Sequence, residues 1–144
     1  MKFELNIVPD KPTINNRVYK LEDLKEIFQK VDIPVSLFPS KNGVVKIEDI
    51  LGFANLSEIN SEVVEFEVKI IKTGYEDVIK DKQLSPSIIG DVKRVDIKDE
   101  CGLITESNNV VFDMILVGLY VVQETNMARL NPVGRVPVLK TGNR

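Results

Sequence analysis

The sequence contains no histidine, no tryptophan and only one cysteine, Cys101, in 144 residues. The missing histidine removes the most common general base, the Ser-His and Cys-His nucleophile pairs and histidine metal ligands. A single cysteine excludes an intramolecular disulfide and a multi-cysteine zinc site, so we interpret Cys101 as a buried or incidental thiol. These absences argue against an enzyme, although a Ser-Lys pair or a carboxylate pair stays open as catalytic machinery.

Ligand-binding and targeting motifs are also missing. The chain has no glycine-rich phosphate loop, no zinc spacing and no calcium-loop spacing, so we expect no cofactor and no metal. No run reaches the roughly 18 apolar residues needed to cross a bilayer. Polar Lys2, Glu4 and Asn6 follow Met1 at once, so the start lacks a signal-peptide core. We therefore expect a protein made and kept in a cytosol, with no membrane partner.

The charge is unevenly distributed along the chain. From Thr125 onward there are four basic residues and no acidic one, whereas residues 1–124 carry 15 basic and 22 acidic residues, a net charge of −7. A basic end on an acidic body predicts that this end meets a negative surface, either a neighbouring copy or nucleic acid. Basic and acidic residues alternate in the body, and the tail has no aromatic residue for base stacking, so nucleic acid is the weaker candidate.

The clearest strand pattern lies at Ser61–Thr73, where Val64, Phe66, Val68 and Ile70 alternate with charged residues. Helical spacing of Leu21, Leu24, Ile27, Phe28 and Val31 predicts a helix at about 20–31. Further strands are expected at 2–8, 34–38, 91–98, 103–105 and 110–123, with two short strands and a bulge near Gly52 in 44–56. Turns are expected at 99–102 and 107–109, and 75–82 is expected to form a helical turn or a surface loop. We predict a β-rich α+β fold: a small curled sheet or barrel of about six to eight strands with one helix near the start.

The chain divides into one globular domain, 1–124, and an extended basic C-terminal arm, 125–144. The arm is too apolar for a solvated tail and too interrupted by proline and glycine for a helix. It either orders against another subunit or packs back on its own domain. If it binds a partner, its charged and apolar side chains make the contacts: Arg129, Leu130, Arg135, Val136, Val138, Leu139, Lys140 and Arg144.

Ser85 and Ser87 in the segment LSPSIIG are the best-placed candidate nucleophiles, because they lie at a strand entrance before a glycine. Serine needs a base to lose its proton, and no lysine is placed beside them by any spacing. A structural role in turns or caps is the preferred interpretation. Asp113, the one charge in the most apolar run, is likewise expected at a strand end or in a hydrogen bond rather than in catalysis.

Three segments resemble the phage prohead proteases, a family similar in fold to the herpesvirus assemblins. They are NNRVYKLEDL at Asn15–Leu24, DILGFANL with VVEFEVKIIKTG at Asp49–Gly74, and LSPSIIG at Leu84–Gly90. The resemblance covers about residues 13–123 and implies a serine nucleophile at Ser85 or Ser87. The family's histidine would be expected near Pro34–Ser40, where this chain has none, so the resemblance implies a catalytically dead domain kept as a structural part of a virus particle.

We therefore expect a non-enzymatic phage structural protein, such as an auxiliary or decorating capsid component, made in the host cytoplasm and present in the virion. Its partners would be other capsid or virion proteins or further copies of itself. A prohead-protease-like serine hydrolase with a non-histidine base and a small cytosolic adaptor remain the alternatives.

Overall fold

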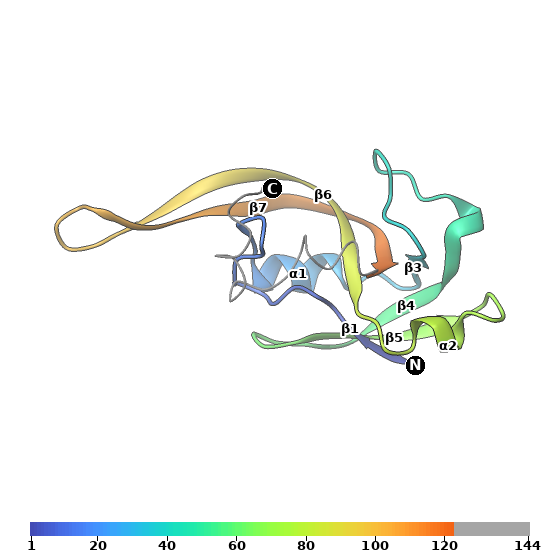
Figure 1. Cartoon of the computed structure of the whole chain (residues 1–144). Helices are drawn as coiled ribbons and strands as arrows, with labels where there is room; N and C mark the ends of the chain where they lie inside the picture. Colours follow the sequence, from blue (N-terminus) through green and yellow to red (C-terminus); the bar gives the residue numbers. More distant parts are fainter. Residues whose placement is uncertain (123–144) are drawn as a thin grey trace.

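The computed structural model describes residues 1–122, and the predicted C-terminal arm with its boundary at 124 lies outside this range. The described chain forms one mixed sheet with two short helices (Figure 1). Its strands are β1 (Lys2–Glu4), β2 (Arg17–Tyr19), β3 (Ile33–Ser36), β4 (Ile50–Ile59), β5 (Val64–Ile70), β6 (Leu84–Lys98) and β7 (Ile104–Val121). Helices α1 (Leu21–Ile27) and α2 (Glu76–Ile79) and the 3₁₀ turn η1 (Ile47–Asp49) complete it. The β-rich α+β prediction is confirmed.

The strand order is β1-β5-β4-β3-β7-β2, with β6 paired along the other edge of β7. β7 pairs in parallel with β2 and β3 and antiparallel with β6, so it links the N-terminal and C-terminal parts of the sheet. The sheet is open and uncurled, and the expectation of a curled sheet or barrel is wrong. Between β1 and the start of β6 there is only one isolated bridge, Leu5 to Leu84, and no ladder of paired strands closes the sheet there.

The core lies where α1 packs against the sheet. Leu24 and Phe28 are fully buried, and the Phe28 ring meets the Phe66 ring edge to face, with centroids 5.1 Å apart. Val64, Phe66 and Val68 of β5 all point inward, so the alternation read from the sequence is confirmed. Such T-shaped aromatic packing contributes beyond simple area burial.

The predicted helix at 20–31 exists but is shorter. α1 begins at Leu21, whose backbone N–H donates to Asp10 Oδ1 (3.0 Å), and Phe28 is its C-cap. Val31, predicted on the apolar face, is 76% exposed, and Asp32 follows with φ +55°. The chain therefore turns into β3 before the apolar pattern has ended.

β4 is one strand of ten residues, and the expected pair of short strands in 44–56 is wrong. Gly52 explains the continuity, because a Cβ at this position would lie 2.1 Å from the Lys69 carbonyl oxygen on β5. Only glycine permits this close approach of the two backbones.

The turn expected at 107–109 and the short strand expected at 103–105 are parts of β7, which runs unbroken from Ile104 to Val121. Asn109 pairs with Arg17 of β2, and Ser107 and Asn108 pair with β6, so these turn-forming residue types lie inside a ladder. Non-local pairing overrides their local preference. The 99–102 turn is confirmed, closing with Asp99 N–H to the Leu103 carbonyl (2.9 Å).

Candidate protein-docking site

The feature that stands out is the far half of the β6–β7 hairpin, residues 91–112, which we call the projecting hairpin. It extends well beyond the rest of the described chain (Figure 1). Its register runs from Asp91 opposite Phe112 to Lys98 opposite Ile104. Residues 91–106 are all exposed. The outer part is thus a two-stranded ribbon with solvent on both faces.

A bulge separates the projecting hairpin from the body. The β6–β7 register shifts between Ile89 and Asp91, where Gly90 lies opposite the extra residue of β7. Asp113 occupies this bulge with φ +52° and is exposed. Bulges increase local twist and re-aim a strand, and aspartate tolerates the left-handed conformation better than most residues. The Asp113 charge is therefore placed at a bend inside the strand and not at the strand end predicted from the sequence.

The N-terminal loop fixes the base of the projecting hairpin. β2 pairs in parallel with Asn109–Val111, and the Asn16 side-chain amide donates to the Ser107 carbonyl oxygen (3.0 Å). The backbone N–H of Asn109 donates in turn to the Asn16 carbonyl oxygen (3.2 Å). β2 therefore covers this edge of β7 at the base of the hairpin, where β6 is the outermost strand.

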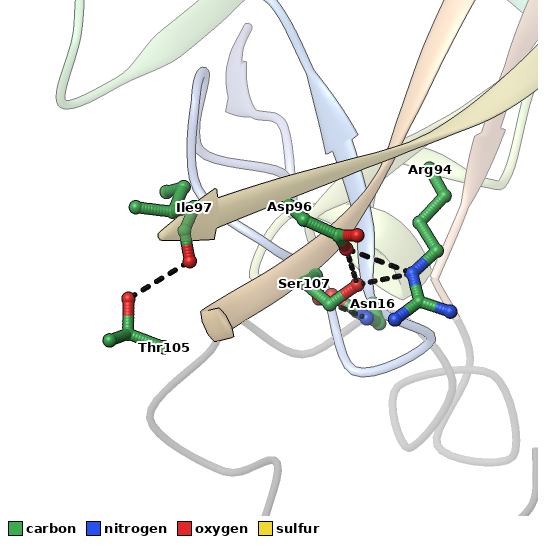
Figure 2. A network of polar contacts seen from close by, with 6 residues as sticks. All are labelled: Asn16, Arg94, Asp96, Ile97, Thr105 and Ser107. Carbon is green, nitrogen blue, oxygen red and sulfur yellow. Dashed lines mark hydrogen bonds and ion pairs between the residues drawn. The ribbon is translucent and has the colours of Figure 1, made fainter. Parts of the chain in front are cut away.

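A polar network ties the two strands together (Figure 2). Arg94 Nε donates to Asp96 Oδ1 (2.9 Å) and to Ser107 Oγ (2.7 Å), and the Ser107 hydroxyl donates to Asp96 Oδ1 (2.5 Å). The Ser107 hydrogen bond, followed by the one from Arg94, holds the pKa of Asp96 below its usual value. Thr105 Oγ1 also donates to the Ile97 carbonyl oxygen (3.1 Å). These contacts join β6 to β7 through their side chains.

The same ribbon exposes apolar side chains that a soluble monomer usually buries. Leu103 at the turn is 66% exposed, and four more large aliphatic residues of the hairpin are also exposed: Val92, Val95, Ile97 and Ile104. Within residues 1–122, β6 has no partner along Val92–Lys98 except β7. An open edge combined with exposed apolar residues is typical of a surface that binds another protein strand.

A second candidate surface is the outer face of β1, β5 and β4. Glu65 lies directly opposite Glu4 on one side and Glu58 on the other, so three carboxylates form a row across the sheet. Lys2 Nζ lies 3.7 Å from Glu65 Oε1, which offsets only part of this charge. Like charges in opposed positions destabilise a sheet, and a basic partner relieves that repulsion.

The predicted nucleophiles lie where β6 enters the sheet, as expected, but both are buried. Ser85 is 0% exposed, and within the described chain its Oγ has no hydrogen-bond partner. Ser85 and Ser36 flank Tyr120 in one row of the sheet, and the Ser36 Oγ is also unpartnered. Ser85 is therefore an enclosed serine whose hydroxyl makes no hydrogen bond within residues 1–122.

Ser87 is covered by the loop between β3 and β4. Its Oγ accepts a hydrogen bond from the Ser40 backbone N–H (3.3 Å). A Cβ on Gly43 of the same loop would lie 2.8 Å from Ile89 Cδ1, which shows how closely the loop lies on β6. The turn or cap role expected for these serines is wrong, because both lie inside β6, where Ser87 anchors this loop to the sheet.

Other predicted features fall as follows. Cys101 is exposed in the turn of the projecting hairpin. No group of three or more potential metal ligands gathers anywhere in residues 1–122, and no helix of that range is both long and apolar enough to cross a bilayer. The predicted partner-binding residues lie outside the described range: Arg129, Leu130, Arg135, Val136, Val138, Leu139, Lys140 and Arg144.

Sequence reasoning predicted a hairpin turn at 99–102 with a short strand after it, but missed the length of the projecting hairpin. A signal was present, because the turn at 99–102 is flanked by stretches of similar length that can pair residue by residue. Interpreting Ser107–Asn109 as a second turn divided this hairpin into fragments.

No protein-family model matches the chain, and neither the curated proteins nor the solved structures contain a match.

Proposed function

We propose that this protein is a non-enzymatic structural component of a phage particle, an auxiliary or decorating capsid protein that binds neighbouring subunits. The projecting hairpin carries the proposal, because an exposed two-stranded ribbon with open edges and uncovered aliphatic side chains is suited to lie on another protein. The resemblance of three segments to the phage prohead proteases supports the setting in a virus particle.

Charge supports a second contact of the same kind. The C-terminal segment carries Arg129, Arg135, Lys140 and Arg144 without an acidic residue, and the body is acidic. The carboxylate row of Glu4, Glu65 and Glu58 offers a basic segment of a neighbouring subunit a matching surface. Such pairs act mainly on specificity and association rate, so we assign binding energy chiefly to the apolar hairpin.

The burial of both candidate serines favours assembly over hydrolysis. A nucleophile must reach its substrate and must contact a base. Ser85 meets neither condition within the described chain, and Ser87 accepts a backbone hydrogen bond from the loop that covers it. A prohead-protease-like fold without working catalytic machinery is consistent with these observations.

The test is co-sedimentation with particles from the native source. The variant Leu103→Lys with Ile104→Lys places charge on the exposed hairpin surface, and Val44→Lys with Ile47→Lys is the control, with the same added charge on two exposed aliphatic residues elsewhere. We expect the wild type and the control to sediment with particles rich in one other protein, and the hairpin variant to stay in the supernatant. Recovery of the wild type only as free protein would overturn the proposal, as would full retention of the hairpin variant.

A further inference from the structure

The outer edge of β6 from Val92 to Lys98 presents backbone N–H and C=O groups with no strand beside them within residues 1–122. Proteins usually protect such edges, because an open edge pairs with whatever strand fits it. The sequence of residues 91–98 is DVKRVDIK, in which basic and acidic residues are interspersed with aliphatic ones. The order of these charges determines which neighbouring strand the edge of β6 can pair with.

We propose that β6 pairs antiparallel with β6 of a second copy, with the two-fold axis at Val95, to give a four-stranded ribbon β7-β6-β6-β7. A two-fold axis perpendicular to a sheet preserves its faces, so each residue must meet one with which it already shares a face. With the axis at Val95, Arg94 meets Asp96 of the second copy, and Asp96 meets its Arg94. Lys93 meets Ile97, and Val92 meets Lys98.

The side chains on both faces fit this register. On one face, one Arg94–Asp96 pair between the two copies lies on each side of the axis. Each of these pairs adds to the Arg94–Asp96 contact that already exists within one chain. Within residues 1–122 Arg94 donates hydrogen bonds from Nε alone, so its terminal nitrogens can meet a second carboxylate. On the other face, the two Val95 side chains meet at the axis, with Ile97 and the aliphatic stem of Lys93 beside them.

Neighbouring registers are opposed by charge. An axis at Arg94 places two guanidinium groups opposite each other, an axis at Asp96 opposes two carboxylates, and an axis at Lys93 opposes two ammonium groups. Like charges directly opposite destabilise a sheet. An axis at Val92 or Ile97 pairs charges well but soon extends into the bulge at position 90 or the turn at 99–102. Only an axis at Val95 pairs every residue from Val92 to Lys98 with a residue of the second copy.

The arrangement also fits the shape of the molecule. β6 is the outermost strand of a ribbon that projects from the body (Figure 1), so antiparallel pairing places the two bodies at opposite ends of the shared ribbon. A sheet of four strands is a more stable unit than an isolated two-stranded hairpin. Pairing of two copies therefore converts each two-stranded hairpin into part of a more stable four-stranded sheet.

The first experiment measures the monomer–dimer equilibrium of the purified full chain by sedimentation velocity over a range of concentrations. Arg94→Asp and Asp96→Arg each place like charges opposite one another at both pairs and should weaken dimerisation by about tenfold or more. The double variant Arg94→Asp/Asp96→Arg restores opposite charges and should recover the wild-type dissociation constant. A monomer at all concentrations, or a dimer equally strong in the single variants, would overturn the proposal.

The second experiment locates the axis with a disulfide in a Cys101→Ser background. Val95→Cys places two thiols at the axis, where facing Cα atoms are about 4.5–5.5 Å apart, within disulfide range. Lys98→Cys is the control on the same strand, because its two copies would lie about 20 Å apart. We expect mild oxidation to give a covalent dimer of the first variant only. Equal cross-linking of both would contradict this register.

The inference goes beyond the proposed function and can fail separately from it. A chain that dimerises through β6 but never sediments with particles would refute the virion role and leave the dimer intact. A chain that sediments with particles but stays monomeric when purified would refute only the dimer.

Discussion

Replacing Ser85 by alanine should stabilise the protein, which is the opposite of what removal of a hydrogen-bonded buried side chain does. The Ser85 Oγ is completely buried and has no hydrogen-bond partner within the described chain, so folding removes it from water without compensation. Such a loss costs about 1–3 kcal/mol, part of which is offset by the packing contacts of the oxygen. We expect Ser85→Ala to raise the free energy of unfolding by about 1 kcal/mol.

Ser87→Ala is the matched control, two residues along the same strand. The Ser87 Oγ accepts a hydrogen bond from the Ser40 backbone N–H, so its removal should lower the free energy of unfolding by about 0.5–1.5 kcal/mol. Ser40 is only partly buried, and water can reach its N–H in the variant, which favours the lower half of that range. The two substitutions should therefore shift stability in opposite directions.

Equilibrium urea unfolding, followed by far-ultraviolet circular dichroism, measures both effects. A difference of about 2 kcal/mol between the two variants corresponds to roughly 1 M in the urea midpoint. The same proteins should be assayed for self-cleavage and peptide cleavage, with no loss expected in either variant. If Ser85→Ala destabilises the fold and abolishes a cleavage activity, the assignment of Ser85 as a buried structural serine is wrong and the hydrolase alternative is right.

Three further predictions concern the sheet and the hairpin. Gly52→Ala should destabilise by about 3 kcal/mol or more in urea unfolding, because its Cβ would lie 2.1 Å from the Lys69 carbonyl oxygen, and an unchanged midpoint would contradict this. Asp113→Gly should be tolerated at φ +52°, whereas Asp113→Val should cost about 1–3 kcal/mol, and equal stabilities would refute a left-handed bulge. Ser107→Ala should raise the pKa of Asp96 toward its ordinary value in an NMR titration, and an unmoved pKa would show that the hydrogen bond is absent. Because folding lowers the pKa of Asp96, its contribution to stability is present above the ordinary aspartate pKa and is lost as pH falls through the folded value.

The local elements were the predictable part of this fold. Alternation at Ser61–Thr73 identified β5, and helical spacing identified α1, because both patterns arise within one element. The parallel pairing of β2 with Asn109–Val111 joins segments about ninety residues apart, and no local pattern signals it. For the same reason β7 was read as separate pieces, since its Ser and Asn residues favour turns when considered alone.

The two candidate serines were predicted in position but not in environment. Ser85 and Ser87 do lie at a strand entrance before Gly90, as their sequence context indicates. Their burial depends on the loop that Ser40 and Gly43 bring over β6, and that contact is set by tertiary packing. Sequence patterns describe which side of a strand a residue takes, but not which distant loop covers that side.

The charge pattern of β6 should limit uncontrolled association through its exposed edge. A flat apolar edge pairs in many registers and aggregates, and Lys and other charges on an edge normally block pairing altogether. In DVKRVDIK the charges have both signs, so they oppose the registers centred on Lys93, Arg94 and Asp96 but not the one centred on Val95. Exposed Val95 and Ile97 then contribute apolar contact only when that register forms. In the proposed dimer such an edge gives a specific, closed association, because the open segment of each β6 is used once two copies have paired.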